Sequence, residues 1–296
     1  MNKLLCVVGP TGTGKTAKAI ELSKDQPSIL VSADSRQVYR GMDIVTGKDH
    51  PKDIIIYGID IIGPDEQCSV SLWYDSVMPH IYQAWDEGKL PIVVGGTGLY
   101  VKALTDGIGT MQVPIDQSLR DQLDALSIPE LQNKLNDLDQ TKFNSMNHSD
   151  VNNPRRLIRA IEVATDQNKG RTFVMSGPNP LTMQSKIIGL KYSDHLNPSG
   201  QAGYQSKIRQ RVLQRIEAGA VQETKSLLCK YDKNIQSMTS IGYKSIVNFL
   251  ENHLTEEEMI EEWVSGEFAY AKRQLTWFRK QPVIWYDVDS YANNKS

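Results

Sequence analysis

The sequence LLCVVGPTGTGKT at residues 4–16 joins a short apolar run to a glycine-rich loop and then to an amphipathic segment. Leu4–Val8 predicts a buried strand, and the residues from Lys15 to about Lys24 predict a helix. Between them, Gly9 to Thr16 fit the pattern G-x-x-x-x-G-K-[ST] of a P-loop. A strand, this loop and a helix in direct succession are the context in which the pattern is specific.

The loop is expected to hold a diphosphate. Its glycines let the backbone curl so that successive N–H groups face one anion, and the N-terminus of the helix adds positive potential. Lys15 is expected to neutralise the outer phosphate, and the Thr16 hydroxyl to bind Mg²⁺. The alternative is a glycine-rich turn without a ligand. The predicted diphosphate site consists of Gly9, Pro10, Thr11, Gly12, Thr13, Gly14, Lys15 and Thr16.

A second apolar run, Ile29–Val31, ends in the sequence SADSRQ at residues 32–37. The carboxyl ends of neighbouring parallel strands lie at the same edge of a sheet, so Asp34 is expected to face the phosphate loop. A carboxylate there can bind Mg²⁺ or accept a proton from a nucleophile. The alternative interpretation is that Asp34 caps the N-terminus of a following helix.

The rest of the chain predicts a parallel sheet interrupted by a helical insertion. Four further strands are expected at Ile54–Ile61, Pro91–Val94, Lys186–Tyr192 and Pro282–Tyr286. Residues 116–167 show only helical periodicity, and residues 200–280 are expected to be mostly helical, with breaks near Gly219, Ser237–Gly242 and His253. We therefore expect an α/β fold: a P-loop NTPase-like core of residues 1–113 and 185–296, and an inserted helical domain of residues 114–184.

Composition excludes several classes of protein. The fractions of hydrophobic (40%) and charged (23%) residues are typical of a globular domain. No run approaches the roughly 18 apolar residues of a membrane span, and the apolar N-terminal run is too short for a signal peptide. Three scattered cysteines lack the spacing of a zinc site or a disulfide framework. We expect a cytoplasmic monomer without a membrane partner.

The net charge of −2 conceals an uneven distribution. Val151–Arg215 contains eleven Lys or Arg and three acidic residues, a net charge of +8, which leaves −10 for the remainder. A basic block in an acidic chain is the electrostatic footprint of a polyanionic partner, although solvated surface charge is the alternative. Within the block, Arg211 and Arg215 are expected to share a helical face.

A cluster of arginines at residues 155–159 stands out in this block. Only Glu162 lies at helical spacing from Arg159, and no acid is expected beside Arg155 or Arg156. This favours RNA binding over a helix edge with local ion pairs. Near the C-terminus, Trp277 and Phe278 are expected to pack a helix on the core, and a base-stacking platform is the alternative.

Seven motifs follow one another along the chain: GPTGTGKT (9–16), SADSRQVYRGMDIVTGK (32–48), VVGGTGLYVKAL (93–104), NNPRRLIRAIEV (152–163), KIRQRV (207–212), SIGYK (240–244) and AKRQLTWFRK (271–280). Together they resemble the bacterial tRNA dimethylallyltransferases, also called tRNA isopentenyltransferases. The resemblance extends from Leu4 to about Asp287, in the order of that family. Thr239 and Lys244 stand where its members often carry arginine.

The resemblance implies transfer of a dimethylallyl group from dimethylallyl diphosphate to N6 of adenine 37 in tRNA, beside the anticodon. Asp34 would contact the N6 amine as the base, Thr16 would hold Mg²⁺, and Arg211 would help to hold the diphosphate; these three are the predicted catalytic residues. The implied tRNA contacts are Asp34, Ser35, Arg36, Gln37, Thr97, Arg120, Arg155, Arg156, Leu157, Ile158, Arg159, Thr239, Ser240, Ile241, Gly242, Tyr243 and Lys244.

These residue types suit the chemistry. An allylic diphosphate ionises readily, and Lys15, Arg211 and Mg²⁺ would stabilise the departing diphosphate. The adenine would have to leave the stack of the anticodon loop to reach the site. Three alternatives remain: a P-loop small-molecule kinase that uses ATP, an adenylate prenyltransferase that uses free AMP, and a non-catalytic nucleotide-dependent RNA-binding switch. The helical insertion and the basic block favour tRNA over the first two, and the switch leaves Asp34 without a role.

Overall fold

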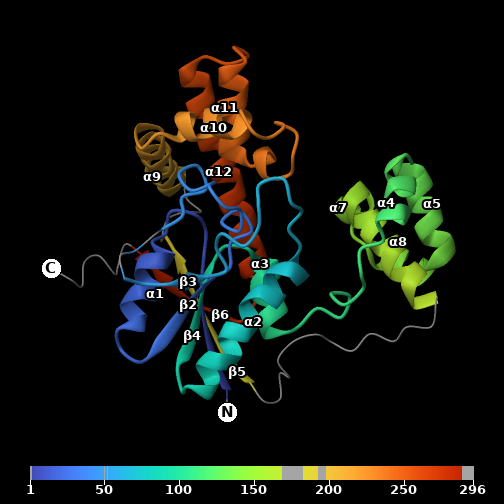
Figure 1. Cartoon of the computed structure of the whole chain (residues 1–296), viewed down its shortest axis with the longest axis horizontal. Helices are drawn as coiled ribbons and strands as arrows, with labels where there is room; N and C mark the ends of the chain where they lie inside the picture. The colour runs from blue at the N-terminus through green and yellow to red at the C-terminus, as the bar shows by residue number, and fades with distance from the viewer. Residues whose placement is uncertain (1, 50, 52, 169–182, 193–197, 289–296) are drawn as a thin grey trace. The chain divides into compact units, whose positions relative to one another are not determined.

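We analyse a computed structural model that describes residues 2–49, 51, 53–168, 183–192 and 198–288. The chain divides into two compact units (Figure 1). The core unit comprises Met1–Asp106 and Pro178–Ser296, and the helical unit comprises Gly107–Gly177. The sequence placed the insertion at residues 114–184, so the two divisions differ by about seven residues at each end. The Gly, Pro and Asn-rich stretch at 176–180 lies outside the described residues.

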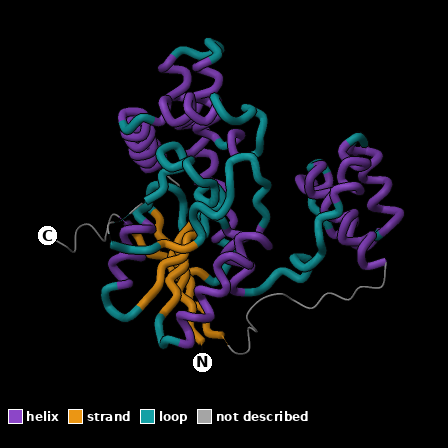
Figure 2. The backbone as a smooth tube through the Cα atoms, viewed as in Figure 1, coloured by secondary structure: helices purple, strands orange, loops and turns teal. Residues whose placement is uncertain are grey.

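A single parallel sheet forms the centre of the core unit (Figure 2). Its strand order is β3-β2-β4-β1-β5-β6. Its centre is apolar because Val7, Leu30, Ile92 and Ile188 come from four neighbouring strands and pack together. The α/β class with a parallel sheet is thereby confirmed. The strands are β1 (Asn2–Val8), β2 (Ser28–Ser32), β3 (Ile56–Tyr57), β4 (Leu90–Gly95), β5 (Met183–Lys191) and β6 (Val283–Asp287).

One expected strand is much shorter than its apolar sequence suggested. Of Ile54–Ile61, only Ile56–Tyr57 pair with β2. Asp53 and Asp60 have positive φ angles of 63° and 54°, so the backbone turns on both sides of β3 and leaves the extended conformation. The prediction of a long strand here was wrong because these turns override the apolar pattern.

The helices of the core unit follow the sequence pattern closely. In the first half they are α1 (Lys15–Ser23), α2 (Val70–Asp86) and α3 (Gly98–Thr105). In the second half they are α9 (Pro198–Glu217), α10 (Ala220–Leu228), α11 (Ile241–Leu250) and α12 (Glu256–Phe278), with a 3₁₀ turn η1 at Ser237–Thr239. The breaks expected near Gly219, Ser237–Gly242 and His253 are confirmed. No helix in the described part of the chain is long and apolar enough to cross a membrane.

The helical unit has its own hydrophobic core, which includes Leu123, Leu135, Leu157 and Ile161. Leucines at helical spacing supply this core, as their periodicity predicted. An independent core allows the unit to be considered as a domain of its own. Its helices are α4 (Gln117–Asp124), α5 (Ile128–Leu138), α6 (Gln140–Ser145), α7 (His148–Val151) and α8 (Pro154–Asn168).

Candidate active site

The phosphate loop connects β1 to α1 at the carboxyl edge of the sheet. Its first residue, Gly9, has a φ of 144°, and a Cβ there would lie 2.3 Å from the main-chain oxygen of Leu190 in β5. Only glycine tolerates both that backbone conformation and that close approach. The Thr13 hydroxyl donates to the Pro10 carbonyl at 2.9 Å and tightens the loop from inside. The sequence pattern therefore folds here as a compact loop before a helix.

Two cations lie beside the loop. The Lys15 ammonium donates to the Pro10 carbonyl at 2.8 Å, and burial lowers the pKa of Lys15 to about 8 although the nearby Asp34 opposes that shift. The Arg211 side chain, from α9, approaches Gly12 so closely that a Cβ there would lie 3.3 Å from Arg211 Cδ. Arg211 is exposed to solvent, yet partial desolvation beside the loop, followed by the neighbouring Arg215, lowers its pKa. An anion on the loop would relieve this concentration of positive charge.

Side chains from the second half of the chain hold Thr11 on three sides. Its N–H donates to Gln274 Oε1 at 3.0 Å, and its hydroxyl donates to Glu267 Oε2 at 3.3 Å. Its carbonyl accepts from the Tyr204 hydroxyl at 2.5 Å. None of these partners was predicted from the sequence, because α9 and α12 bring them from about 190 to 260 residues away.

Asp34 lies two residues after the end of β2 and lines the same cavity as Lys15. Its Oδ1 accepts from the Arg36 N–H at 2.9 Å, which caps a turn, since no helix follows. Among the described residues we find no hydrogen-bond donor to its other oxygen. The neighbouring Ser35 N–H donates to Thr97 Oγ1 at 3.0 Å, so the loop after β4 supports this turn. The helix-cap alternative is wrong, and a turn cap takes its place.

A cavity of about 430 Å³ in the core unit brings several predicted residues together. The phosphate loop contributes Thr11 and Lys15, and the turn after β2 contributes residues 34–36. Residues 239–242, which end the 3₁₀ turn and begin α11, complete this part of the lining. The buried Ser240 hydroxyl has no hydrogen-bond partner among the described residues. Five further residues line the cavity that were not predicted as site residues: Arg215, Glu267, Tyr270, Arg273 and Gln274.

Two other predicted residues of the core unit, Gln37 and Tyr243, form hydrogen bonds next to the cavity. The Gln37 side chain accepts from the Ser32 hydroxyl at 2.9 Å and donates to the Gly47 carbonyl at 3.2 Å. The buried Tyr243 hydroxyl donates to Glu223 at 2.6 Å. Glu223 in turn accepts from three consecutive main-chain N–H groups, those of residues 43–45. These contacts fix the long segment after β2, of which Val45 and Thr46 line the cavity.

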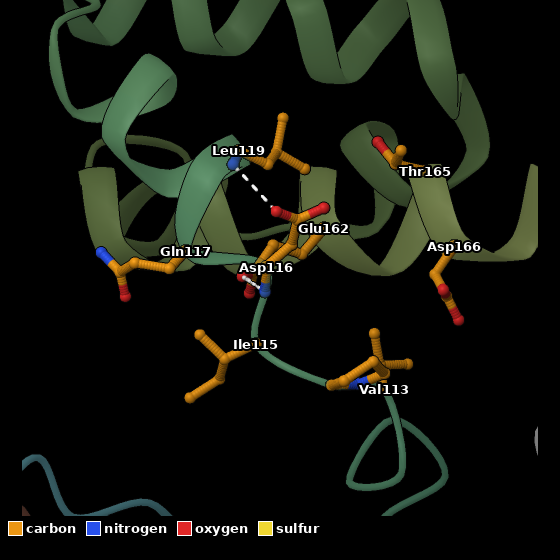
Figure 3. Close-up of a pocket in the computed structure, with 9 residues that line it drawn as sticks. Val113, Ile115, Asp116, Gln117, Leu119, Glu162, Thr165 and Asp166 are labelled. Carbon is orange, nitrogen blue, oxygen red and sulfur yellow. Dashed lines mark hydrogen bonds between the residues drawn. The ribbon is translucent and has the colours of Figure 1, made fainter.

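The helical unit contains a second pocket, of about 340 Å³, which Glu162 helps to line (Figure 3). The Glu162 side chain is only 1% exposed, and Arg120 donates to it through Nε at 2.7 Å and Nη2 at 2.8 Å. Arg159 Nη1 adds a third bond at 3.1 Å. Burial opposes ionisation of Glu162, but these hydrogen bonds outweigh it and lower its pKa.

The arginines of α8 differ in what they contact. Arg159 also donates to the carbonyls of Thr110 and Val113, at 2.8 and 2.9 Å. Arg156 pairs with Asp150 across the turn between α7 and α8, so the expectation that no acid lies near it was wrong. Arg155 is exposed and has no ion-pair partner among the described residues.

The side chains of Leu157 and Ile158 are 0% and 5% exposed and belong to the core of the helical unit. Within residues 155–159, only the arginine side chains are accessible to solvent. The whole unit, residues 107–177, carries eight Lys or Arg against nine Asp or Glu. The +8 block therefore does not make this unit basic; it continues into β5 and α9, where Arg209 pairs with Glu257 and Glu261.

The C-terminal aromatic pair packs on the core as expected. Phe278 is fully buried, and the Trp277 ring lies so close to Gly98 that a Cβ there would be 2.3 Å from it. The described residues contain no group of three or more His, Cys, Asp or Glu side chains that could hold a metal ion. Thr16, at the second position of α1, is the predicted metal ligand.

Comparison with known proteins gives a consistent result. A family model described as IPP transferase matches residues 37–281, and one described as isopentenyl transferase matches residues 2–57. The tRNA dimethylallyltransferase of Bacillus mycoides (strain KBAB4) is 35% identical over 295 residues, which cover 97% of this chain and 90% of the relative. That of Halalkalibacterium halodurans is 34% identical over 300 residues, which cover 97% and 91%.

Solved structures share the fold. The tRNA isopentenylpyrophosphate transferase of Bacillus halodurans matches with a TM-score of 0.69 and 33% identity, over 97% of this chain and 90% of that one. A eukaryotic dimethylallyltransferase acting on tRNA matches in fold with a TM-score of 0.76 and 22% identity, over 97% and 74%. The motifs, the cavity beside the phosphate loop and these matches lead to one conclusion: the chain belongs to the IPP transferase family.

Proposed function

We propose that the protein transfers a dimethylallyl group from dimethylallyl diphosphate to N6 of adenine 37 in tRNA. The main support for this proposal is that Lys15 of the phosphate loop and Asp34 line the same cavity. The first can bind the donor's diphosphate, and the second can accept a proton from the acceptor. Relatives named tRNA dimethylallyltransferase, about a third identical over nearly the whole chain, support this pair of substrates.

In the proposed reaction, the C–O bond between the allylic carbon and the diphosphate breaks and a bond from N6 to that carbon forms. Lys15, Arg211 and the loop N–H groups stabilise the negative charge that develops on the leaving diphosphate. The adenine amine is a weak nucleophile because its lone pair is delocalised into the ring. Asp34 orients this amine and takes its proton as the new bond forms.

The Mg²⁺ expected for this chemistry fits the oxygen donors at the loop. Mg²⁺ in phosphate sites is usually held by one or two protein oxygens, with substrate phosphates and water as the remaining ligands. The Thr16 hydroxyl, in the first turn of α1, would supply the protein ligand. The ion would add positive charge beside the leaving diphosphate.

The tRNA would contact residues 34–37 and 239–244 of the core unit and the arginines of α8. We also expect the protein to act as a cytoplasmic monomer. Among the α8 arginines, Arg155 is the best placed to contact phosphate, since no acid neutralises it within the described part of the chain.

A transfer assay tests the proposal against its alternatives. Labelled dimethylallyl diphosphate is incubated with the protein and unmodified tRNA, in parallel with labelled ATP and tRNA, and with the prenyl donor and AMP. We expect label in tRNA from the prenyl donor alone, and digestion followed by mass spectrometry should place it on adenine 37. Phosphoryl transfer from ATP would support a kinase instead, and prenylated AMP would support an adenylate prenyltransferase.

A further inference from the structure

One buried amide joins two loops of the cavity. Gln274, in α12, is 5% exposed. Its Oε1 accepts from the Thr11 N–H of the phosphate loop at 3.0 Å, and its Nε2 donates to the carbonyl of Gly96 at 3.1 Å. Both ends of the side chain are thus used, each on the main chain of a different loop.

The contact with Gly96 is unusually close. A Cβ at position 96 would lie 1.9 Å from Gln274 Nε2, so only glycine admits the amide at this point. Trp277, about one helical turn further along α12, packs in the same way against Gly98. One face of α12 therefore holds the whole loop from Gly96 to Gly98.

This loop connects Gln274 to the catalytic carboxylate. Thr97, which follows Gly96, accepts a hydrogen bond from the Ser35 N–H, and Ser35 follows Asp34 directly. The Tyr270 phenol lies beside both Thr97 and Gln274, and burial raises its pKa to about 12, so it stays protonated near neutral pH. A continuous series of contacts leads from the phosphate loop to the turn of Asp34.

We infer that Gln274 is a positioning residue that sets the distance between the phosphate loop and Asp34, and with it the alignment of the prenyl donor with the adenine amine. The inference rests on the proposed function. The primary amide of Gln274 offers an acceptor and two donors on separate atoms, so it can bind both loops at once, whereas a carboxylate lacks the donor and an aliphatic side chain lacks both. Small misplacements of reacting groups lower rates far more than they lower affinity.

A double-mutant cycle tests the inference from both sides of the contact. Gln274→Ala removes the amide, whereas Gly96→Ala displaces it with a methyl group and leaves Gln274 in place. We expect each variant to lower the single-turnover rate of prenyl transfer by about tenfold or more. The dissociation constants for tRNA and for a non-reactive prenyl diphosphate should stay within about threefold. The double variant should be little slower than either single one, because the shortened side chain at position 274 leaves room for the added methyl group.

Gln132→Ala is the matched control, because Gln132 likewise donates its amide to a main-chain carbonyl, that of Val151 in the helical unit, at 2.8 Å. It should keep the parental rate. Additive losses in the double variant, or rate losses that match losses of affinity or of melting temperature, would overturn the positioning role. The parent protein is assayed alongside: if it fails to prenylate tRNA, the proposed function is wrong, whereas full rates in Gln274→Ala refute the Gln274 inference alone.

Discussion

The phosphate loop and α8 both carry basic side chains, but the groups that contact these side chains differ. Lys15 donates to a main-chain carbonyl, and no ion pair engages Arg211 among the described residues. In α8, Arg156 and Arg159 each form an ion pair with a carboxylate, and Arg159 also donates hydrogen bonds to two main-chain carbonyls. A cation that lacks a carboxylate partner can still be neutralised by a ligand. A count of basic residues therefore does not measure the positive charge that is available to a polyanion.

The largest effect should come from Asp34→Asn. Asparagine keeps an oxygen that can accept from the Arg36 N–H but cannot take a proton, so the turn should survive while transfer fails. We expect the single-turnover rate to fall by roughly 100-fold or more, the usual contribution of a general base. Affinity for tRNA and the melting temperature should change little. A rate within tenfold of the parent would show that Asp34 is not the base.

Lys15→Ala should weaken the binding of a non-reactive prenyl diphosphate. Hydrogen bonds to charged groups contribute about 1.5–3 kcal/mol, so the dissociation constant should rise roughly 10–150-fold. Lys24→Ala, just beyond the C-terminal end of α1, is the control for a simple loss of positive charge. Calorimetry that finds equal effects for the two variants would mean that the loop binds the anion without Lys15.

The same lysine predicts a pH dependence. Burial lowers the Lys15 pKa to about 8, so the free protein holds the ammonium charged below that pH and loses the charge above it. Affinity for the diphosphate should therefore decline as the pH rises through about 8. In Lys15→Ala this decline should disappear. Its persistence in the variant would assign it to another group.

Arg159→Ala should affect stability more than RNA binding. It removes one donor to the buried Glu162 and two bonds to the chain that leads into α4, so we expect a loss of about 1.5–3 kcal/mol. The pKa of Glu162 is lower in the folded protein than in the unfolded chain, where it is about 4.3. The ionised side chain therefore adds to the free energy of unfolding at any pH above this unfolded-state pKa, and this contribution is lost as the pH falls through the folded-state pKa. In Glu162→Gln, the decrease in the free energy of unfolding at low pH should be smaller. Denaturation of the full chain across pH measures both effects.

The smallest effect should come from Arg155→Ala. If this exposed arginine contacts one RNA phosphate, its loss should reduce the slope of log affinity against log salt by about one unit. The melting temperature and the constant for the prenyl donor should not change. Arg156→Ala, which also frees Asp150, gives the comparison within the helix. An unchanged slope for Arg155→Ala would place the RNA surface elsewhere.

Local pattern was sufficient for much of the fold. The phosphate loop, the parallel strands and the leucine-rich helices follow from residues that are neighbours in sequence or share one helical face. Asp34 could be expected at the site because a strand end and sheet topology place it there. Gln274, Glu223 and Tyr204 could not, because each contacts a segment more than 170 residues away and no periodicity encodes that contact. Helical spacing pointed to the pair of Arg159 with Glu162, but the pair of Arg156 with Asp150 was missed because Asp150 lies in a different helix.

The order of strands in the sheet has a consequence for synthesis of the chain. One edge of β1 pairs with β4, but its other edge pairs with β5, which begins at Met183. Ribosomes add roughly 5–20 residues each second, so the nascent protein carries an open, apolar strand edge for about 10–40 s before its partner is made. Exposed edges of this kind recruit other strands. Chaperone dependence or aggregation should therefore be greatest for nascent chains that end between β4 and β5, and should fall once β5 has emerged.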